Sequence, residues 1–241
     1  MTIRIAMWSG PRNISTAMMR SWENRADTEV VDEPFYAYYL QQTQSPHPLF
    51  DEILASQSSD YNYVTTALCS GPCNTQLQYQ KQMTHHMLDG VDMAWAKSLS
   101  HCFLIRDPAQ VVNSYTNSRG VCCAEDIGII RQAQLYKEIS QLTGQDIPII
   151  DSNDVLQNPK AILSKLCERL NIPFDEGMLV WPAGQRSSDG VWASHWYHSV
   201  EASTGFAQTI SKAFVLSETQ QQVVDEVRPH FEYLYAKRIR A

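Results

Sequence analysis

Short apolar or β-branched runs alternate with longer amphipathic segments along most of the chain. Runs of strand length are expected near residues 3–8, 28–32, 77–83, 101–106 and 147–151. Between the first two runs, apolar residues recur with helical spacing over about 14–25, at Ile14, Ala17, Met18 and Trp22. Strands that alternate with helices are typical of a parallel sheet covered by helices. The pattern therefore predicts a three-layer α/β/α fold with a central, mostly parallel sheet of about five strands.

Two dipeptides mark helix starts further along the chain. Asp107-Pro108 and Asn158-Pro159 each place an N-cap side chain before a proline at the first helical position. We expect the second of these helices over about 159–170. A last helix is expected over about 217–238, and Pro229 inside it should bend or split it.

Residues 181–206 are rich in tryptophan, serine, glycine and histidine and show no regular period. A long irregular segment inside a compact domain is more often a functional lid than a neutral connection. The aromatic cluster from Trp192 to Tyr197, which includes His195, offers flat surfaces on which adenine or a sugar can stack. We interpret this segment as a lid.

The composition narrows the class of protein. With 241 residues, 44% of them hydrophobic, the chain fits a single domain over 1–241 with a sizeable core. Its net charge of −7 disfavours nucleic acid and anionic membranes as partners. No apolar run approaches the ~20 residues of a membrane span, and the apolar part of the N-terminus is too short for a signal peptide, so we expect a cytoplasmic protein. The six cysteines match no complete zinc spacing and are interpreted as reduced thiols, without a metal site.

The first strand is followed by a turn suited to anions. Residues 9–16 read Ser-Gly-Pro-Arg-Asn-Ile-Ser-Thr, a tight turn with one cation and two hydroxyls at the start of a helix. The amides of a helix N-terminus, Ser15, Thr16 and the forked donors of Arg12 together predict a phosphate or sulfate site. The alternative is an ordinary helix start with a surface arginine. The turn lacks the second glycine and the lysine of a Walker A motif, which disfavours an ordinary ATPase.

A second cation stands at the end of the fourth strand. Arg106 follows a buried run, and Ser114 lies eight residues later in the next helix. Ligands of open parallel sheets bind outside the carboxyl ends of the strands, so Arg12 and Arg106 are expected to face the same crevice. The alternative for Arg106 is a salt bridge with Asp107 or Asp151.

Together the two motifs resemble the cofactor motifs of sulfotransferases that use 3′-phosphoadenosine 5′-phosphosulfate (PAPS), in particular the bacterial branch. The resemblance implies a fold like that of P-loop NTPases. It also implies that Arg106 and Ser114, with the family's interval of eight residues, hold the 3′-phosphate. Arg186, ahead of Gly190-Val191-Trp192, partly matches a late family motif and is assigned to the same cofactor. The residues so assigned to the 5′-phosphosulfate loop are Gly10, Pro11, Arg12, Asn13, Ile14, Ser15 and Thr16.

The loop departs from the family pattern at two positions. Arg12 and Ile14 stand where many members have lysine and glycine. The path of the loop backbone and the chemistry at the leaving group are therefore open to question on the sequence alone.

Transfer of a sulfuryl group to a hydroxyl requires a base for the acceptor proton. Glu33 follows the second strand, where several bacterial and glycan sulfotransferases have a glutamate, and Asp32 is its less favoured neighbour. Nearby aromatic side chains would raise the pKa of the Glu33 carboxyl. The alternative for Glu33 is an ion pair with Arg12 or Arg25.

Histidine is the competing base. His85 and His86 follow the third strand, near the place where cytosolic sulfotransferases have a lysine and a histidine. His86 is slightly preferred over its neighbour, and Lys81 is a weaker candidate for contact with the substrate. Adjacent histidines on regular structure point apart, which disfavours a metal site made by both.

The resemblance thus predicts an enzyme that transfers a sulfuryl group in line from PAPS, its co-substrate, without a metal. Arg12, Glu33 and His86 are its expected catalytic residues, and the acceptor is a hydroxyl or amine of a small molecule or short glycan. One alternative is a P-loop nucleotide or small-molecule kinase in which Asp107 or Asp151 serves Mg²⁺-bound ATP. The other is a non-catalytic nucleotide-binding protein. The acceptor, the identity of the base and a homo-oligomeric state stay open.

Overall fold

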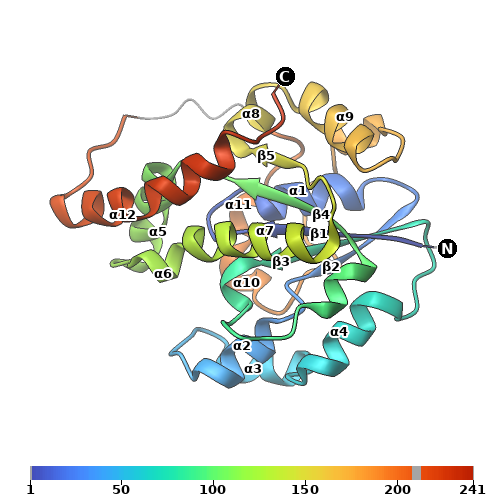
Figure 1. Cartoon of the computed structure of the whole chain (residues 1–241), viewed down its shortest axis with the longest axis horizontal. Helices are drawn as coiled ribbons and strands as arrows, with labels where there is room; N and C mark the ends of the chain where they lie inside the picture. Colours follow the sequence, from blue (N-terminus) through green and yellow to red (C-terminus); the bar gives the residue numbers. More distant parts are fainter. Residues whose placement is uncertain (1, 208–212, 241) are drawn as a thin grey trace.

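Five parallel strands form one sheet in the computed structural model, which describes residues 2–207 and 213–240 (Figure 1). Their order across the sheet is β2-β3-β1-β4-β5. The predicted α/β fold with a parallel sheet of about five strands is confirmed. The strands span β1 (Ile3–Ser9), β2 (Thr28–Asp32), β3 (Leu77–Met83), β4 (Ser100–Ile105) and β5 (Ile149–Asp151).

Helices cover both faces of the sheet because successive strand residues point to opposite sides. On β1, Ile5 and Met7 pack with α1 (Ser15–Glu23) and α9 (Pro159–Arg169). Trp8, on the other face, belongs to a core with side chains from α5 (Pro108–Arg119), α7 (Ile129–Thr143) and α12 (Glu218–Tyr235). Two separate apolar cores therefore sandwich the sheet.

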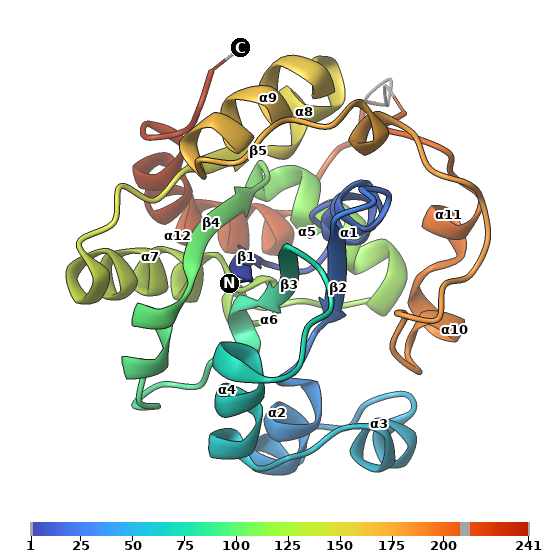
Figure 2. The same cartoon turned by 90° about the vertical axis from the view of Figure 1, so that its right-hand side faces the viewer.

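The other elements lie at the edges of the sheet. A helical group between β2 and β3 lies at one end of the molecule, and α9 lies with α8 (Ser152–Gln157) at the opposite end (Figure 2). The group consists of α2 (Tyr36–Thr43), α3 (Phe50–Ser56) and α4 (Tyr61–Ser70). The remaining short elements are η1 (Thr84–His86), η2 (Ala94–Ser98), α6 (Ala124–Ile127), η3 (Glu176–Leu179), α10 (Ala193–Trp196) and α11 (His198–Glu201).

The predicted helix starts agree with the structure. The Asp107 side chain accepts hydrogen bonds from two amides at the start of α5, and Asn158 caps α9 in the same way. The last helix, α12, continues through Pro229 as one element, so the proline does not split it.

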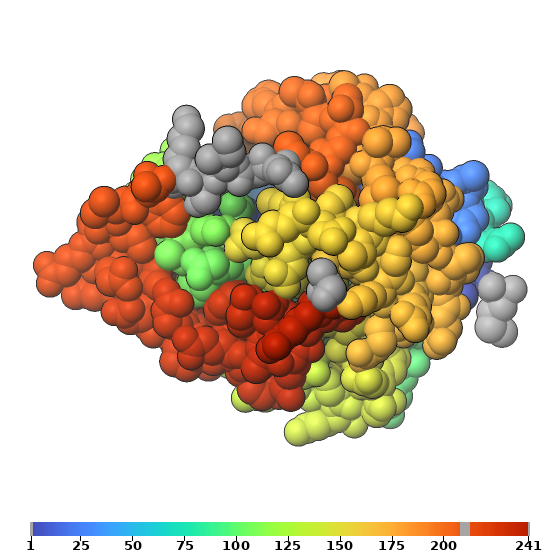
Figure 3. All heavy atoms as spheres, turned by 90° about the horizontal axis from the view of Figure 1, so that it is seen from above, coloured from blue at the N-terminus to red at the C-terminus, as the bar shows by residue number. Residues whose placement is uncertain are grey.

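Residues 181–206 are less irregular than the sequence indicates, since they contain the short helices α10 and α11. In the space-filling view the orange chain that follows α11 borders the yellow region of α8 (Figure 3). All six cysteines are free thiols. In residues 2–207 and 213–240, no helix combines the length and apolar character needed to cross a membrane.

Candidate active site

The loop between β1 and α1 adopts a strained path. At Gly10 a Cβ atom would lie 2.6 Å from the backbone oxygen of Ile127, so no larger residue fits without movement. Arg12 and Ile14 have φ angles of 58° and 32°, in the left-handed region. For a β-branched residue this is a genuine outlier, and such strain gathers at functional sites. Ile14 thus takes the backbone shape that glycine would adopt easily.

This strain leaves the N-terminus of α1 open. Ile14 is the N-cap residue and provides no side-chain hydrogen bond to the first-turn amides, although these amides have no partner within the helix. The side chain of Asn13 donates to the carbonyl oxygen of Leu104 over 2.6 Å, which fastens the loop to β4. Ser15 and Thr16 line the cavity in front of this helix end. The arrangement presents hydrogen-bond donors to an anion.

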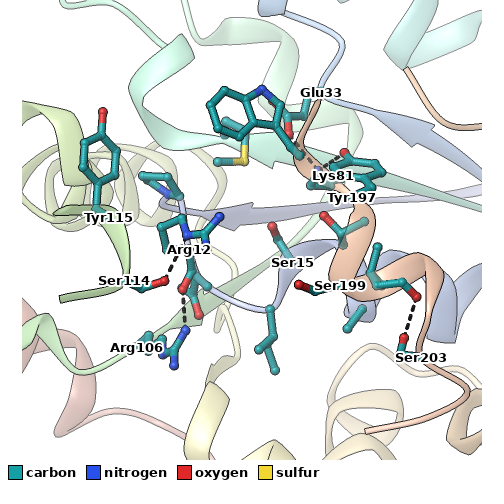
Figure 4. A pocket seen from close by; sticks show the side chains of 18 of the residues that line it. Arg12, Ser15, Glu33, Lys81, Arg106, Ser114, Tyr115, Tyr197, Ser199 and Ser203 are labelled. Carbon is teal, nitrogen blue, oxygen red and sulfur yellow. Dashed lines mark hydrogen bonds and ion pairs between the residues drawn. The ribbon is translucent and has the colours of Figure 1, made fainter. Parts of the chain in front are cut away.

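Two arginines from neighbouring strand ends meet at the loop, as the sequence predicts (Figure 4). The Arg12 Nε donates to Ser114 Oγ over 3.0 Å, and the Arg106 guanidinium donates to the Arg12 carbonyl oxygen over 2.6 Å. Arg106 also donates to Gln110 Oε1. Within the described residues neither arginine forms an ion pair with a carboxylate, so Arg106 has no salt bridge with Asp107 or Asp151.

Burial and neighbouring positive charge lower the pKa values of both guanidinium groups. Partial desolvation lowers the pKa of Arg12, and the positive charge of Arg119 lowers it further. Desolvation and the charge of Arg12 likewise lower the pKa of Arg106, although the charges of Asp151 and Asp107 oppose this. Like charges held together without a carboxylate are stabilised when an anion binds between them.

A buried ionic cluster lies across the cavity, at the ends of β2 and β3. The Lys81 ammonium, 1% exposed, donates to Asp32 Oδ1 over 3.0 Å and to Glu33 Oε1 over 2.7 Å. It also lies 2.5 Å from the hydroxyl of Tyr197, which comes from the segment between α10 and α11. Figure 4 shows Glu33, Lys81 and Tyr197 gathered at this point. Glu33 therefore pairs with Lys81 rather than with Arg12 or Arg25, the expected alternative.

Burial and neighbouring charges shift the pKa values of Glu33 and Lys81 in this cluster. Desolvation raises the pKa of Glu33, and the Asp32 charge adds to this effect, although Lys81 opposes it. Burial alone would lower the pKa of Lys81, but Asp32 and Glu33 outweigh it and hold that pKa well above its ordinary value. Lys81 is thus a permanent cation, and Glu33 is a carboxylate with raised proton affinity.

Of the two histidines after β3, His85 lines the first cavity, whereas His86, the residue preferred from the sequence, does not. His86 is 1% exposed, its ring stacks on Tyr39 at 5.0 Å, and it lies outside the residues that line the cavity. Its Nε2 is 3.9 Å from Glu33 Oε2, and burial lowers its pKa well below the usual range. His85 lines the cavity instead, and burial together with the Arg119 charge lowers its pKa to about 4. Both residues are neutral at physiological pH.

Arg186 lies away from the cavity. Its guanidinium donates to the carbonyl oxygen of Pro182, and its Nε lies 3.7 Å from Glu23. The Arg186 amide donates to Asp189, which itself pairs with Arg20. These local partners hold Arg186 on the far side of α1, so the structure does not bring it to the other predicted cofactor residues.

Two cavities meet at the site. The first, of about 420 Å³, is lined by loop residues 11–16, by Glu33, Lys81, Arg106 and Ser114, and by eight residues between Trp196 and Ala207, most of them in the expected lid. The second, of about 540 Å³, lies beside α2 and α6. Gly10 lies behind the loop and lines neither cavity. The residues that line both cavities are Pro11, Tyr36, His85, Tyr115 and Arg119.

Two residues of the site escaped the sequence reasoning. Tyr197 appears there only as one aromatic residue of an irregular segment, and Arg119 stands at a helix end without a motif. The polar run of β3, in which a lysine occurs where a buried strand should be apolar, is a sequence signal for Lys81 but not for these two residues.

The site is suited to anionic groups, and comparisons with known proteins identify the family. The family model of the sulfotransferase domain matches residues 3–234. The chain therefore belongs to the sulfotransferase domain family. It is 35% identical over 203 residues to branched-chain-amino-acid aminotransferase-like protein 1 of Arabidopsis thaliana, covering 84% of this chain. The chain spans only 36% of that relative's length.

Solved structures agree on the fold. The sulfotransferase domain from the curacin biosynthetic pathway has a TM-score of 0.56 at 16% identity, over 95% of this chain and 98% of that one. Mouse sulfotransferase SULT7A1 complexed with PAP has a TM-score of 0.56 at 11% identity, over 96% of this chain and 89% of that one. The predicted resemblance to the sulfotransferases is thereby confirmed.

Proposed function

We propose that this sulfotransferase takes its sulfuryl group from PAPS and transfers it to a hydroxyl or amine of a small molecule or short glycan. One observation carries the proposal. Arg12 and Arg106, from two neighbouring strand ends, lie together beside the uncapped N-terminus of α1 without an ion-pairing carboxylate among the described residues. Such a site favours a ligand with more than one anionic group.

The donors divide into two groups that fit the two phosphate positions of PAPS. The first-turn amides of α1, with Ser15 and Thr16, would hold the 5′-phosphate end. Arg106 and Ser114 would hold the 3′-phosphate, with Arg12 between the two groups through its bond to Ser114. The likeness in fold to a sulfotransferase solved with PAP supports this assignment.

Bound PAPS would supply an activated sulfuryl group on its 5′-phosphate. In the transfer, the bond from sulfur to the 5′-phosphate oxygen breaks while a bond from sulfur to the acceptor oxygen or nitrogen forms. The Glu33 carboxylate accepts the acceptor proton, since burial raises its pKa and it lines the cavity. Lys81 and the amides of α1 stabilise the negative charge that grows during the transfer.

The second cavity is the proposed acceptor site. Its volume of about 540 Å³ lies within the usual range for small ligands, and it adjoins the first cavity along a shared wall. Tyr36, Tyr39 and Tyr115 give it aromatic faces, and Asp89 and Asp126 add hydrogen-bond acceptors. Such a lining suits a hydroxylated ring or sugar.

The acids that a kinase would need are engaged elsewhere. Asp107 accepts hydrogen bonds from the amides of Ala109 and Gln110 and so caps α5. Asp151 caps α8 in the same way, and burial raises its pKa to about 6. Neither residue lines the first cavity, which favours sulfuryl transfer over Mg²⁺-dependent phosphoryl transfer.

Calorimetric binding of 3′-phosphoadenosine 5′-phosphate (PAP) tests the proposal. The wild type should bind PAP more tightly than Mg²⁺-bound ATP, and Arg106→Ala should weaken PAP binding by about 1.5–3 kcal/mol, as expected for a charged hydrogen bond. Arg169→Ala is the matched control, because this exposed arginine pairs with Asp146 away from the cavities. Tighter binding of ATP, together with no effect of Arg106→Ala, would overturn the proposal.

A further inference from the structure

Arg119 is a cation at the junction of the two cavities. It is the last residue of α5, and it lines both the first and the second cavity. Its guanidinium lies over the ring of Trp196, 4.3 Å from the centroid, and 5.4 Å from that of Tyr115. Its guanidinium also lies 3.4 Å from His47 Nε2 and forms a hydrogen bond with the Tyr36 hydroxyl. Within residues 2–207 and 213–240 it has no carboxylate partner.

The other cations of the first cavity have protein partners that direct them toward the proposed nucleotide or into the Asp32 cluster. Arg12 donates to Ser114, and Arg106 donates to the Arg12 carbonyl and Gln110. Lys81 is shared between two carboxylates and Tyr197. Arg119 therefore has hydrogen-bond donors to spare at the place where the two cavities meet.

The surroundings of Arg119 fix its position. A guanidinium stacked on aromatic rings keeps its planar fork oriented while its N–H groups stay free to donate at their edges. Its electrostatic reach covers the whole junction, because its charge lowers the pKa of Arg12 on one side and of His47 on the other. An anionic group between the cavities would relieve this repulsion.

We propose that Arg119 binds the oxygens of the sulfuryl group at the wall between the two cavities. This inference rests on the proposed function, in which the nucleotide occupies the first cavity and the acceptor the second. A group that passes from one to the other must cross the wall that Arg119 shares with Tyr36 and His85. A planar guanidinium can donate two parallel hydrogen bonds to two oxygens of such a group.

The proposal explains a departure from the family pattern. Where many sulfotransferases carry a lysine in the loop, this chain has Arg12, and its Nε is directed to Ser114, on the side of Arg106. The loop side chain is thereby drawn toward the proposed 3′-phosphate position. Arg119 supplies a cation from the end of α5, where the first cavity adjoins the second.

The test compares two nucleotides that differ only in the sulfuryl group. PAPS and PAP are titrated calorimetrically, at low temperature, into the wild type and into Arg119→Met, which keeps an extended apolar side chain against Trp196. We expect Arg119→Met to weaken PAPS binding about tenfold, the loss of roughly one charged hydrogen bond, while PAP binding changes little. Arg119→Lys keeps the charge but loses the planar fork of donors, so its affinity for PAPS should lie between those of the wild type and Arg119→Met.

Arg169→Met removes an equal charge from an exposed position outside both cavities and should change neither affinity. Equal weakening of PAPS and PAP by Arg119→Met, or no weakening of either, would overturn the role of Arg119 and leave the nucleotide site intact. Failure of the wild type to bind PAP would instead overturn the proposed function, and the inference with it.

Discussion

Two adjacent carboxylates at the end of β2 have different surroundings. Asp32 accepts hydrogen bonds from Lys81, from the Tyr197 hydroxyl at 2.7 and 2.9 Å, and from the Gly190 amide at 3.1 Å. Glu33 has Lys81 alone as its strong donor. Hydrogen-bond donors stabilise an ionised carboxylate, and Glu33 has fewer of them, while burial raises its pKa. We therefore propose Glu33 as the base and a structural role for Asp32.

Replacement of Glu33 tests this division of roles. Glu33→Gln should lower sulfuryl transfer by roughly 10²–10⁴-fold, the usual contribution of a general base, with PAP binding retained. Release of PAP from PAPS, with water or an identified alcohol as acceptor, measures the rate. Because the base acts when ionised and burial raises its pKa, the wild-type rate should rise with pH in a range above that of an exposed glutamate.

The same pH rise should be absent from Glu33→Gln. Glu29→Gln, on the same strand, is the control and should keep both the rate and its pH dependence, since Glu29 interacts with Gln78 away from the cavity. A full rate in Glu33→Gln would exclude Glu33 as the base and direct attention to His85.

At the scale of elements, the segment around α10 and α11 is tied to the sheet by polar contacts as well as by packing. Tyr197 bonds both Asp32 and Lys81, and the Trp192 indole donates to the Tyr197 hydroxyl over 3.0 Å. The same segment then continues along the first cavity with Ser199 and Val200. The buried carboxylate of β2 thus holds the wall of the cavity in place.

Removal of the Tyr197 hydroxyl should loosen this wall. Tyr197→Phe leaves the buried Trp192 indole N–H without its partner and removes hydrogen bonds from Asp32 and Lys81, which should lower the free energy of unfolding by about 1–3 kcal/mol. It should also weaken PAP binding, because the wall of the first cavity is less ordered. Chemical denaturation and calorimetry measure the two effects.

Ser194→Ala is the control within the same segment, since the Ser194 hydroxyl only donates to the carbonyl oxygen of Val191 at the surface. Its stability should stay within about 0.5 kcal/mol of the wild type. Equal stability of Tyr197→Phe and the wild type would show that packing alone holds the segment.

The whole molecule combines an acidic surface with a local group of cations. The chain carries 26 acidic and 19 basic side chains, for a net charge of −7. Arg12, Arg106 and Arg119 nevertheless line one cavity without carboxylate partners among the described residues. A polyanionic nucleotide is therefore repelled at long range and attracted at short range.

The affinity for PAP should depend on the salt concentration. An increase from about 0.1 M to about 1 M salt shortens the Debye length from about 10 Å to about 3 Å, which should weaken PAP binding roughly tenfold as the contacts to the cations are screened. In Arg106→Ala the dependence of affinity on salt should be shallower, because one cation is missing. Identical slopes for the two proteins would argue against contact between Arg106 and a phosphate.

Local sequence signals sufficed for much of the fold. These signals depend on neighbouring residues: the strand runs, the alternation of strands with helices, and the N-cap and proline pairs at 107–108 and 158–159. The structure agrees with each of them. The continuity of α12 was less predictable, because packing of its apolar face lets the helix continue through Pro229.

By itself, the sequence determined the parallel sheet, the turn between the first strand and the first helix, and the meeting of Arg12 with Arg106 at the carboxyl ends of two strands. These follow from local periodicity, and from the rule that parallel strands end at one edge. Only the tertiary structure decided that Tyr197 joins Asp32 and Lys81, that His85 rather than His86 faces the cavity, and that Arg186 stays outside. Those outcomes depend on contacts between residues up to 165 positions apart, and competition among such distant partners leaves no periodic or motif signal in the chain.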